Sequence, residues 1–314
     1  MALHYKLQLL LWGQKLRGDK PLNQLSPQEA RLAYKKRMQE VDKIANFVTP
    51  VHNITKQTIE VDNGNIELRI YHPTAEPNLP ICMFFHGGGF VVGDLDTYEP
   101  LCKRLASLAN CIVIAADYRL APEYSFPTAH EDCYKATLWA YQNAHTFGGN
   151  AQKIALCGDS AGGNLANAVA MMLRDRKQTI KICQQILIYP TLDATFGCSS
   201  INQLAEGYLL TREMMFWFLK QYVPENQDRT NIYLSPLFAK DLKSLPPTLI
   251  ITAEYDPLKD EGRLYAQKLL QAGVPTTEIN YLGMIHAFIQ LPKFLRQADE
   301  AQKLIAKTLK KAFA

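Results

Sequence analysis

Residues 158–162, Gly-Asp-Ser-Ala-Gly, have the spacing of a nucleophilic serine held between two glycines. They follow an apolar run at 153–157 and precede a stretch at 165–174 with helical spacing. A serine on a sharp turn from strand to helix is held in a strained conformation, with its hydroxyl above the sheet. The amide of Ala161 would then lie at a helix N-terminus, where negative charge is favoured. Ser160 is therefore a candidate nucleophile, although a serine–glycine turn that merely caps a helix would look the same.

Neither glycine-rich segment of the chain fits a nucleotide-binding motif. Gly158 and Gly163 have the separation that a phosphate-binding loop requires, but Asn164 stands where that loop needs a lysine. The glycines at 87–89 fail the dinucleotide pattern because Val92 occupies the position of its last glycine. No spacing of histidine, cysteine and aspartate resembles a metal site either, so the sequence predicts neither cofactor nor metal.

The segment His86-Gly87-Gly88-Gly89 follows the apolar run at 81–85. Three successive glycines at the end of a strand let the backbone approach a ligand closely. Such a loop supplies amide donors to a tetrahedral oxyanion, beside the amide that follows the nucleophile. An ordinary glycine-rich turn is the alternative, and the serine motif further along the chain argues against it.

An acid and a base must follow the serine, in that order, if these segments form a hydrolase site. Asp256 follows the apolar run at 248–252, at the end of a strand where open α/β sheets bind ligands. Of the neighbouring carboxylates, Glu254 is expected to be structural and Asp260 to lie on the next helix. Asp256 is therefore the candidate acid.

Seven histidines compete for the role of base. His286 follows the apolar run at 277–282 and a glycine, which makes it the candidate. His86, inside the glycine loop, is expected to orient that loop. The others lie outside any such context and are expected at the surface or in packing: His4, His52, His72, His130 and His145.

These residues need a scaffold, and short apolar runs that alternate with longer helical stretches predict one. Apolar runs joined by helices are typical of a parallel sheet that helices cover on both faces. An antiparallel hairpin is expected first, with strands at 57–62 and 66–72 around Asn63-Gly64-Asn65. The later runs predict strands at 81–85, 111–116, 153–157, 182–189, 248–252 and 277–282, with helices near 98–109, 128–145 and 165–174.

Helical segments outside this alternation predict a lid. One helix is expected near 3–16 and a second at 26–46, whose Ser-Pro-Gln-Glu opening is a capping signature. Residues 191–245 interrupt the alternation and contain a nearly all-apolar helix around 214–218. The methionine and aromatic side chains around 208–218 either line an acyl pocket beneath the lid or simply pack the lid onto the body.

Composition and charge exclude several classes of protein. The 314 residues are 47% hydrophobic and 20% charged, which is ordinary for a globular protein and excludes a disordered chain. The net charge is +4, no basic patch with aromatics indicates nucleic acid, and Lys35-Lys36-Arg37 is expected on a solvated helix face. No apolar stretch reaches signal-peptide or membrane-spanning length, so a cytoplasmic protein without integral membrane association is expected.

The cysteines agree with a reducing compartment. Seven is an odd number, so they cannot all pair within the chain, and no C-x-x-C motif occurs. Four are expected to behave as small hydrophobic side chains because they lie within or beside apolar runs: Cys82, Cys111, Cys157 and Cys183.

Together these motifs resemble those of the hormone-sensitive-lipase-like (bacterial family IV) carboxylesterases of the α/β-hydrolase fold. The likeness runs from about residue 40 to the C-terminus and rests on four motifs in the family's order. Residues 117–123, Asp-Tyr-Arg-Leu-Ala-Pro-Glu, also resemble a recurring stretch of that family. The four motifs are His86-Gly87-Gly88-Gly89, residues 158–163, residues 256–262 and His286-Ala287-Phe288.

The resemblance implies a mostly parallel eight-stranded sheet with helices on both faces and a helical cap. It implies cap helices at 1–50, a catalytic domain at 51–190 and 246–314, and a cap insertion at 191–245. It also assigns roles to six residues: Ser160 as nucleophile, Asp256 as acid, His286 as base, and the amides of Gly88, Gly89 and Ala161 as the oxyanion hole.

The activity that the resemblance implies is hydrolysis of short to medium acyl-chain esters through an acyl-enzyme. The expected partner is a small-molecule ester, with no cofactor, metal or nucleic acid, and a homodimer is left open. An amidase, thioesterase or peptidase would use the same triad, so these stay alternatives. A non-catalytic small-ligand receptor of this fold would have a disrupted triad, usually at the histidine, whereas His286 is present here.

Overall fold

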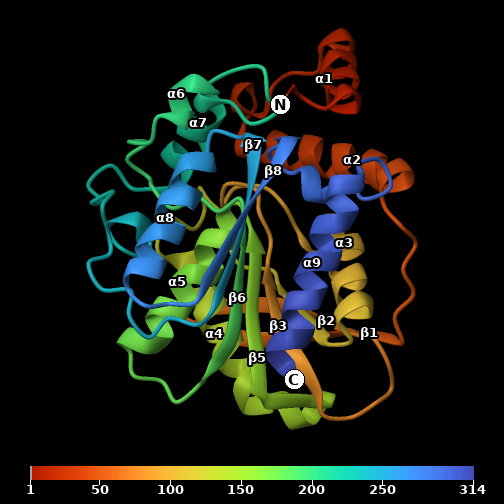
Figure 1. Ribbon diagram of the computed structural model, residues 1–314, viewed down its shortest axis with the longest axis vertical. Coiled ribbons are helices and arrows are strands. Elements are labelled where there is room, and N and C mark those ends of the chain that lie inside the picture. Colours follow the sequence, from red (N-terminus) through yellow and green to blue (C-terminus); the bar gives the residue numbers. More distant parts are fainter. Residues whose placement is uncertain (1) are drawn as a thin grey trace.

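The computed structural model describes residues 2–314, and within them one sheet of eight strands forms the centre of the molecule (Figure 1). The strand order is β1-β2-β4-β3-β5-β6-β7-β8. Only the β1–β2 and β2–β4 pairs are antiparallel among these strands. The bounds are β1 Asn53–Val61, β2 Gly64–His72, β3 Leu79–Phe85, β4 Ile112–Ala116, β5 Gly149–Asp159, β6 Ile182–Ile188, β7 Thr248–Tyr255 and β8 Thr276–Ile285.

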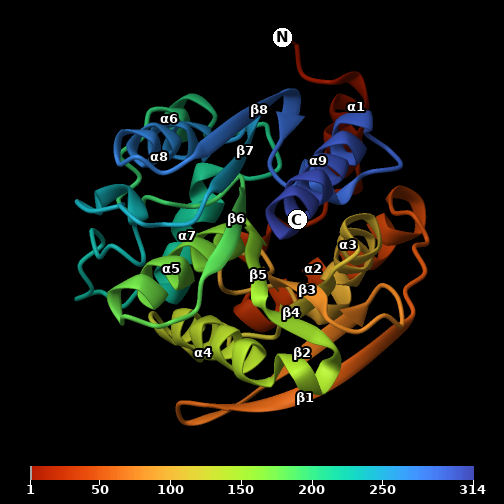
Figure 2. The same ribbon diagram turned by 60° about the horizontal axis from the view of Figure 1, so that its bottom comes forward.

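Helices cover both faces of the sheet (Figure 2). Alternate residues of a strand point to opposite faces, and in β4 Ile112 and Ile114 pack into one apolar layer while Val113 and Ala115 pack into the other. The first layer lies under α4 (Thr128–Asn143), α5 (Ala161–Asp175) and α8 (Lys259–Gln271); the second lies under α3 (Leu95–Ala109) and α9 (Arg296–Phe313). The α/β-hydrolase fold predicted from the sequence is confirmed.

A group of helices from two distant parts of the chain forms the cap at one end of the sheet, at the top of Figure 1. In the N-terminal part, the helix α2 begins with a complete capping box: the side chain of Ser26 accepts the amide of Glu29, and the side chain of Glu29 accepts the amide of Ser26. The segment between β6 and β7 supplies the rest. Their bounds are α1 Tyr5–Arg17, η1 Leu22–Gln24, α2 Pro27–Ala45, α6 Ser200–Gln203 and α7 Arg212–Tyr222. The 3₁₀ helix η3, Pro236–Phe238, belongs to the same segment between β6 and β7 but lies against α8.

Two local expectations need correction. The hairpin turn is Asp62-Asn63 rather than 63–65, because Val61 pairs with Gly64 and Asn63 takes the positive φ of 60°. The helix α4 stops at Asn143, and residues 144–147 continue as the 3₁₀ helix η2. Cys183, expected as a small hydrophobic side chain, is half-buried and packs against the second apolar layer.

The charged stretch at 35–37 is not simply solvated. Lys35 forms ion pairs with Asp94 (2.8 Å) and Asp96 (2.7 Å), so it ties α2 to the start of α3. Among the described residues all seven cysteines are free, and no helix has the length and apolar character needed to cross a bilayer. The domain boundaries drawn from the sequence stay a prediction.

Candidate active site

Ser160 lies on the turn between β5 and α5, with φ 55° and ψ −120°. A positive φ is rare for a residue other than glycine and is kept only where neighbouring contacts enforce it. Here the amide of Ser160 donates to the carbonyl of Ile188 on β6 at 2.8 Å. A side chain at Gly162 would overlap the carbonyl oxygen of Phe85, so the turn can lie this close to β3 only with glycine there.

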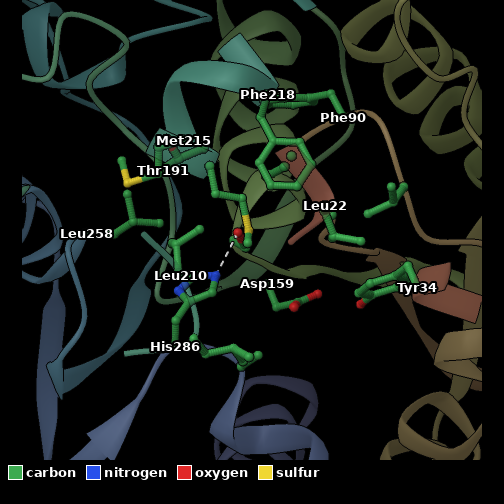
Figure 3. Close-up of a pocket in the computed structure, with 18 of the residues that line it drawn as sticks. Leu22, Tyr34, Phe90, Asp159, Thr191, Leu210, Met215, Phe218, Leu258 and His286 are labelled. Atoms are coloured by element: carbon green, nitrogen blue, oxygen red, sulfur yellow. Dashed lines mark hydrogen bonds between the residues drawn. The ribbon is translucent and has the colours of Figure 1, made fainter. Parts of the chain in front are cut away.

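Ser160, His286 and Asp256 form one hydrogen-bonded row. Nε2 of His286 lies 3.0 Å from Oγ of Ser160 (dashed in Figure 3), and its Nδ1 lies 2.7 Å from Oδ2 of Asp256. Because a carboxylate accepts the proton of Nδ1, Nε2 is left to accept the serine proton. Asp256 is fully buried, and the backbone amide of Leu258 donates to its other oxygen at 2.9 Å. The ring of Tyr189 packs against the imidazole at 4.5 Å.

The sequence-predicted oxyanion amides lie in the loop after β3 and at the first residue of α5. Gly88 and Gly89 both have positive φ, 119° and 60°. Within residues 2–314 neither of their amides, nor that of Ala161, donates to another protein group. The N-terminus of α5 also favours negative charge at this position. A negatively charged oxygen beside Ser160 could therefore accept hydrogen bonds here.

Asp159 joins the serine turn to the glycine loop. Its Oδ1 accepts the amide of Gly87 at 2.8 Å, and its Oδ2 accepts the hydroxyl of Tyr98 at 3.1 Å. Burial raises the pKa of Asp159 to about 6, partly offset by these donors. His86 is buried as well, and desolvation lowers its pKa to about 4, so its ring is neutral near pH 7.

A cavity of about 200 Å³ opens onto Ser160 and His286 (Figure 3). Its walls come from the N-terminal cap, the second cap segment and the body, and they are mainly apolar. Of the methionine and aromatic side chains of α7, Met214, Met215, Phe218 and Tyr222 line the cavity, whereas Phe216 and Trp217 do not. Lining residues include Leu10, Gln14 and Met38 from the first cap segment, and Leu210, Met214, Met215, Phe218 and Leu219 from the second.

The sequence-predicted site residues come together at this cavity, while the rejected candidates do not. Glu254 accepts the amide of Gly283 at 2.6 Å, and Asp260 lies on α8, where it bonds Ser199 and Ser200. Asp159 was missed as a functional residue, although it lies inside the serine motif. Within residues 2–314 no three His, Cys, Asp or Glu side chains are grouped so that they could hold a metal ion.

This fold and this site define a class, the α/β-hydrolases, and comparisons with known proteins agree. The family described as alpha/beta hydrolase fold matches residues 82–290. An arylesterase of Saccharolobus solfataricus is 39% identical over 249 residues, which are 79% of this chain and 81% of that protein. An ethyl acetate hydrolase of Pseudomonas putida is 34% identical over 306 residues, 96% of each chain.

The chain is also similar to a solved esterase structure. The hyperthermophilic esterase from Pyrobaculum calidifontis is 39% identical, and the alignment covers 100% of both chains with a TM-score of 0.94. The chain therefore belongs to the α/β-hydrolase family, in its hormone-sensitive-lipase-like branch, as the motifs predict.

Proposed function

We propose that this carboxylic ester hydrolase acts through Ser160, His286 and Asp256, with an acyl-enzyme intermediate. The observation that carries the proposal is the row of hydrogen bonds from Oγ of Ser160 through the imidazole to the buried carboxylate. His286 takes the serine proton as Oγ attacks the ester carbonyl. Asp256 keeps the imidazole in the required tautomer and stabilises the imidazolium that forms.

The negative charge of the tetrahedral intermediate falls on the former carbonyl oxygen, and the amides of Gly88, Gly89 and Ala161 stabilise it. Removal of one such donor typically lowers kcat about 10²–10³-fold. Collapse of the intermediate releases the alcohol, which takes its proton from His286. Water then repeats the cycle on the acyl-enzyme and releases the acid. The amides' lack of a protein acceptor, within the described chain, supports this role.

The proposed substrates are small esters with short to medium acyl chains. The cavity beside Ser160 has a volume of about 200 Å³, smaller than the roughly 300–1,000 Å³ of sites for drug-sized ligands. Its apolar walls favour an acyl chain over a charged group. The arylesterase and the ethyl acetate hydrolase among the relatives are consistent with small esters. A cytoplasmic location remains a prediction from the sequence.

The test is hydrolysis of p-nitrophenyl esters of increasing chain length by the wild type and by Ser160→Ala. We expect the maximum rate at short to medium chains and a loss of about 10⁴–10⁶-fold in kcat in the variant, by analogy with subtilisin. A phosphonate ester should label the wild type once per chain and leave the variant unlabelled. Unchanged hydrolysis by Ser160→Ala would refute the nucleophile, and faster cleavage of a matched amide would favour an amidase.

A further inference from the structure

The turn that follows the oxyanion glycines determines where their amides point. The carbonyl of Gly88 accepts the amides of Val91 and Val92, at 3.1 and 3.0 Å. These bonds close a tight turn over residues 88–92, so a shift of Val91 is passed directly to Gly88 and Gly89. The position of the proposed oxyanion amides therefore depends on the position of Val91 and Val92.

Residues 117–123, a motif with no role in the proposed mechanism, lie against this loop at two points. The hydroxyl of Tyr118 donates to the carbonyl of His86 at 2.7 Å, and its ring stacks on the imidazole at 4.3 Å. The amide of Ala121 donates to the carbonyl of Phe90 at 2.8 Å. One contact lies before the glycines and one after them, so this segment supports the loop from both sides.

Arg31, from the cap helix α2, joins the two segments. Its Nε donates to the carbonyl of Val91 at 2.9 Å, and its Nη2 donates to the carbonyl of Ala121 at 2.7 Å. Its fork also meets the carboxylate of Glu123, at 3.0 and 2.5 Å. The guanidinium, in turn, holds the pKa of Glu123 below its ordinary value. The guanidinium of Arg31 therefore bonds the turn at 88–92 and the segment at 117–123 together, and the carboxylate of Glu123 fixes its orientation.

We propose that Arg31 is a positioning residue for the oxyanion hole: it fixes the turn at 88–92 from the cap side, so that docking of α2 is needed for full catalytic rate. The inference rests on the proposed function. Only a planar guanidinium can reach two carbonyls and a carboxylate at once, because lysine offers a single compact ammonium. A displacement of about 1 Å in such a constellation can cost about 10²-fold in rate.

A purely structural role for Arg31 makes a different prediction from a positioning role. If the side chain only attached α2 to the body, its loss would lower the melting temperature and change kcat little. If it positions the oxyanion amides, kcat falls while KM stays close to the wild-type value, because the ground-state ester does not use those amides fully. Binding of a trifluoromethyl ketone, which forms an oxyanion on the serine, should then weaken in parallel with kcat.

The experiment compares Arg31→Met and Arg31→Lys with the wild type and with Lys36→Met, a control at an exposed position of the same helix. We expect both Arg31 variants to be folded and to lose about 10–100-fold in kcat, with KM within about threefold. The trifluoromethyl ketone should bind more weakly by a similar factor. The side chain of Arg31 is 28% exposed, so added methylguanidinium at non-denaturing concentration should restore part of kcat in Arg31→Met.

The outcomes separate this inference from the proposed function. Wild-type kcat and inhibitor affinity in folded Arg31→Met would overturn the positioning role, as would a loss shared by Lys36→Met. If Arg31→Met does not fold, Arg31→Lys and Glu123→Gln provide the test. Glu123→Gln leaves Arg31 in place, so it should lower kcat less than Arg31→Lys does. Phosphonate labelling of the wild type at Ser160, run in parallel, tests the proposed function independently.

Discussion

Phe218 of α7 lies directly against Gly89 of the glycine loop after β3: a Cβ at position 89 would overlap Cγ and both Cδ atoms of the phenyl ring. Both cap segments therefore contact this loop: α7 through Phe218 at Gly89, and α2 through Arg31 at Val91. Gly89 also has a φ of 60°, which side chains other than glycine rarely adopt. Both the backbone conformation and the close approach of the cap thus require glycine at this position.

Gly89→Ala should lower kcat about 10²–10³-fold, because the new methyl group pushes the loop or α7 away and displaces an oxyanion donor. The double variant Gly89→Ala/Phe218→Ala should recover at least about tenfold of that loss, since the overlap is removed. Steady-state kinetics on p-nitrophenyl butyrate measures both. Gly273→Ala is the matched control: its φ is 80°, but no heavy atom lies within 4 Å of the added methyl group. Absence of rescue in the double variant would show that backbone strain alone causes the loss.

Phe218 should also limit the length of the acyl chain. It lines the cavity beside Ser160, and its truncation leaves room for additional methylenes, each worth roughly 10–200-fold in discrimination when a pocket fits it. We expect Phe218→Ala to raise the ratio of kcat/KM for octanoate over butyrate esters by about tenfold. Phe238→Ala, an aromatic truncation in the same cap segment but outside the cavity, should leave that ratio unchanged. A ratio that moves equally in both variants would contradict a wall role for Phe218.

The sequence was sufficient to predict the hydrogen-bonded row of Ser160, His286 and Asp256, but not the residues that pack around it. Ser160, Asp256 and His286 could be predicted because each follows an apolar run, and parallel strands bring their carboxyl ends to one edge of the sheet. Arg31 and Phe218 carry no such local signal. Their contacts depend on how the cap packs on the body, that is, on contacts between segments at least 60 residues apart in the chain.

The order of the central strands also escapes local analysis. The sequence predicts the β strands and their rough limits, but periodicity does not say that β3 lies between β4 and β5. The hairpin turn shows the same limitation at smaller scale: Asn-Gly is the usual signal, whereas here the turn is Asp62-Asn63 and the glycine begins the next strand. Such choices depend on the register of the whole sheet.

Asp256→Asn should reduce kcat about 10⁴-fold without unfolding the protein. The amide oxygen can still accept the amide of Leu258, which bonds the carboxylate at 2.9 Å, but the NH₂ group opposes the proton on Nδ1 of His286 and favours the wrong tautomer. Burst and steady-state kinetics with a p-nitrophenyl ester measure the loss. Asp260→Asn, whose side chain bonds Ser199 and Ser200 rather than the histidine, should stay within about threefold of the wild type. A wild-type rate in Asp256→Asn would assign the acid elsewhere.

His130 lies at the junction of α4, α5 and the end of α7, and its bonds define its protonation. Nε2 faces two acceptors, Oδ1 of Asn164 at 2.8 Å and the carbonyl of Tyr233 at 3.2 Å, so it carries the proton. Nδ1 accepts the hydroxyl of Tyr222 at 2.8 Å. Burial lowers the pKa of His130 to about 4. Between about pH 4 and pH 6.5 the ring of His130 is therefore neutral in the folded protein, whereas it is charged in the unfolded chain, where its pKa is 6.5.

From this difference the sign of the pH dependence follows. Between pH 6.5 and 4 the unfolded state binds the proton and the folded state does not, so the free energy of unfolding falls as the pH falls. The share of His130 is about 3 kcal/mol, fully present above pH 6.5 and lost by about pH 4. His130→Gln keeps a donor and an acceptor but cannot titrate; it should be less stable than the wild type at pH 7, with the deficit shrinking by about 3 kcal/mol on acidification. Asp159, which acts in the opposite direction, is common to both proteins and cancels.

Urea unfolding from pH 4 to 7 measures the difference in stability between His130→Gln and the wild type. His145→Gln, at an exposed position, is the control, and its stability should change with pH as that of the wild type does. A constant gap between His130→Gln and the wild type would mean that His130 titrates alike in the folded and unfolded chains.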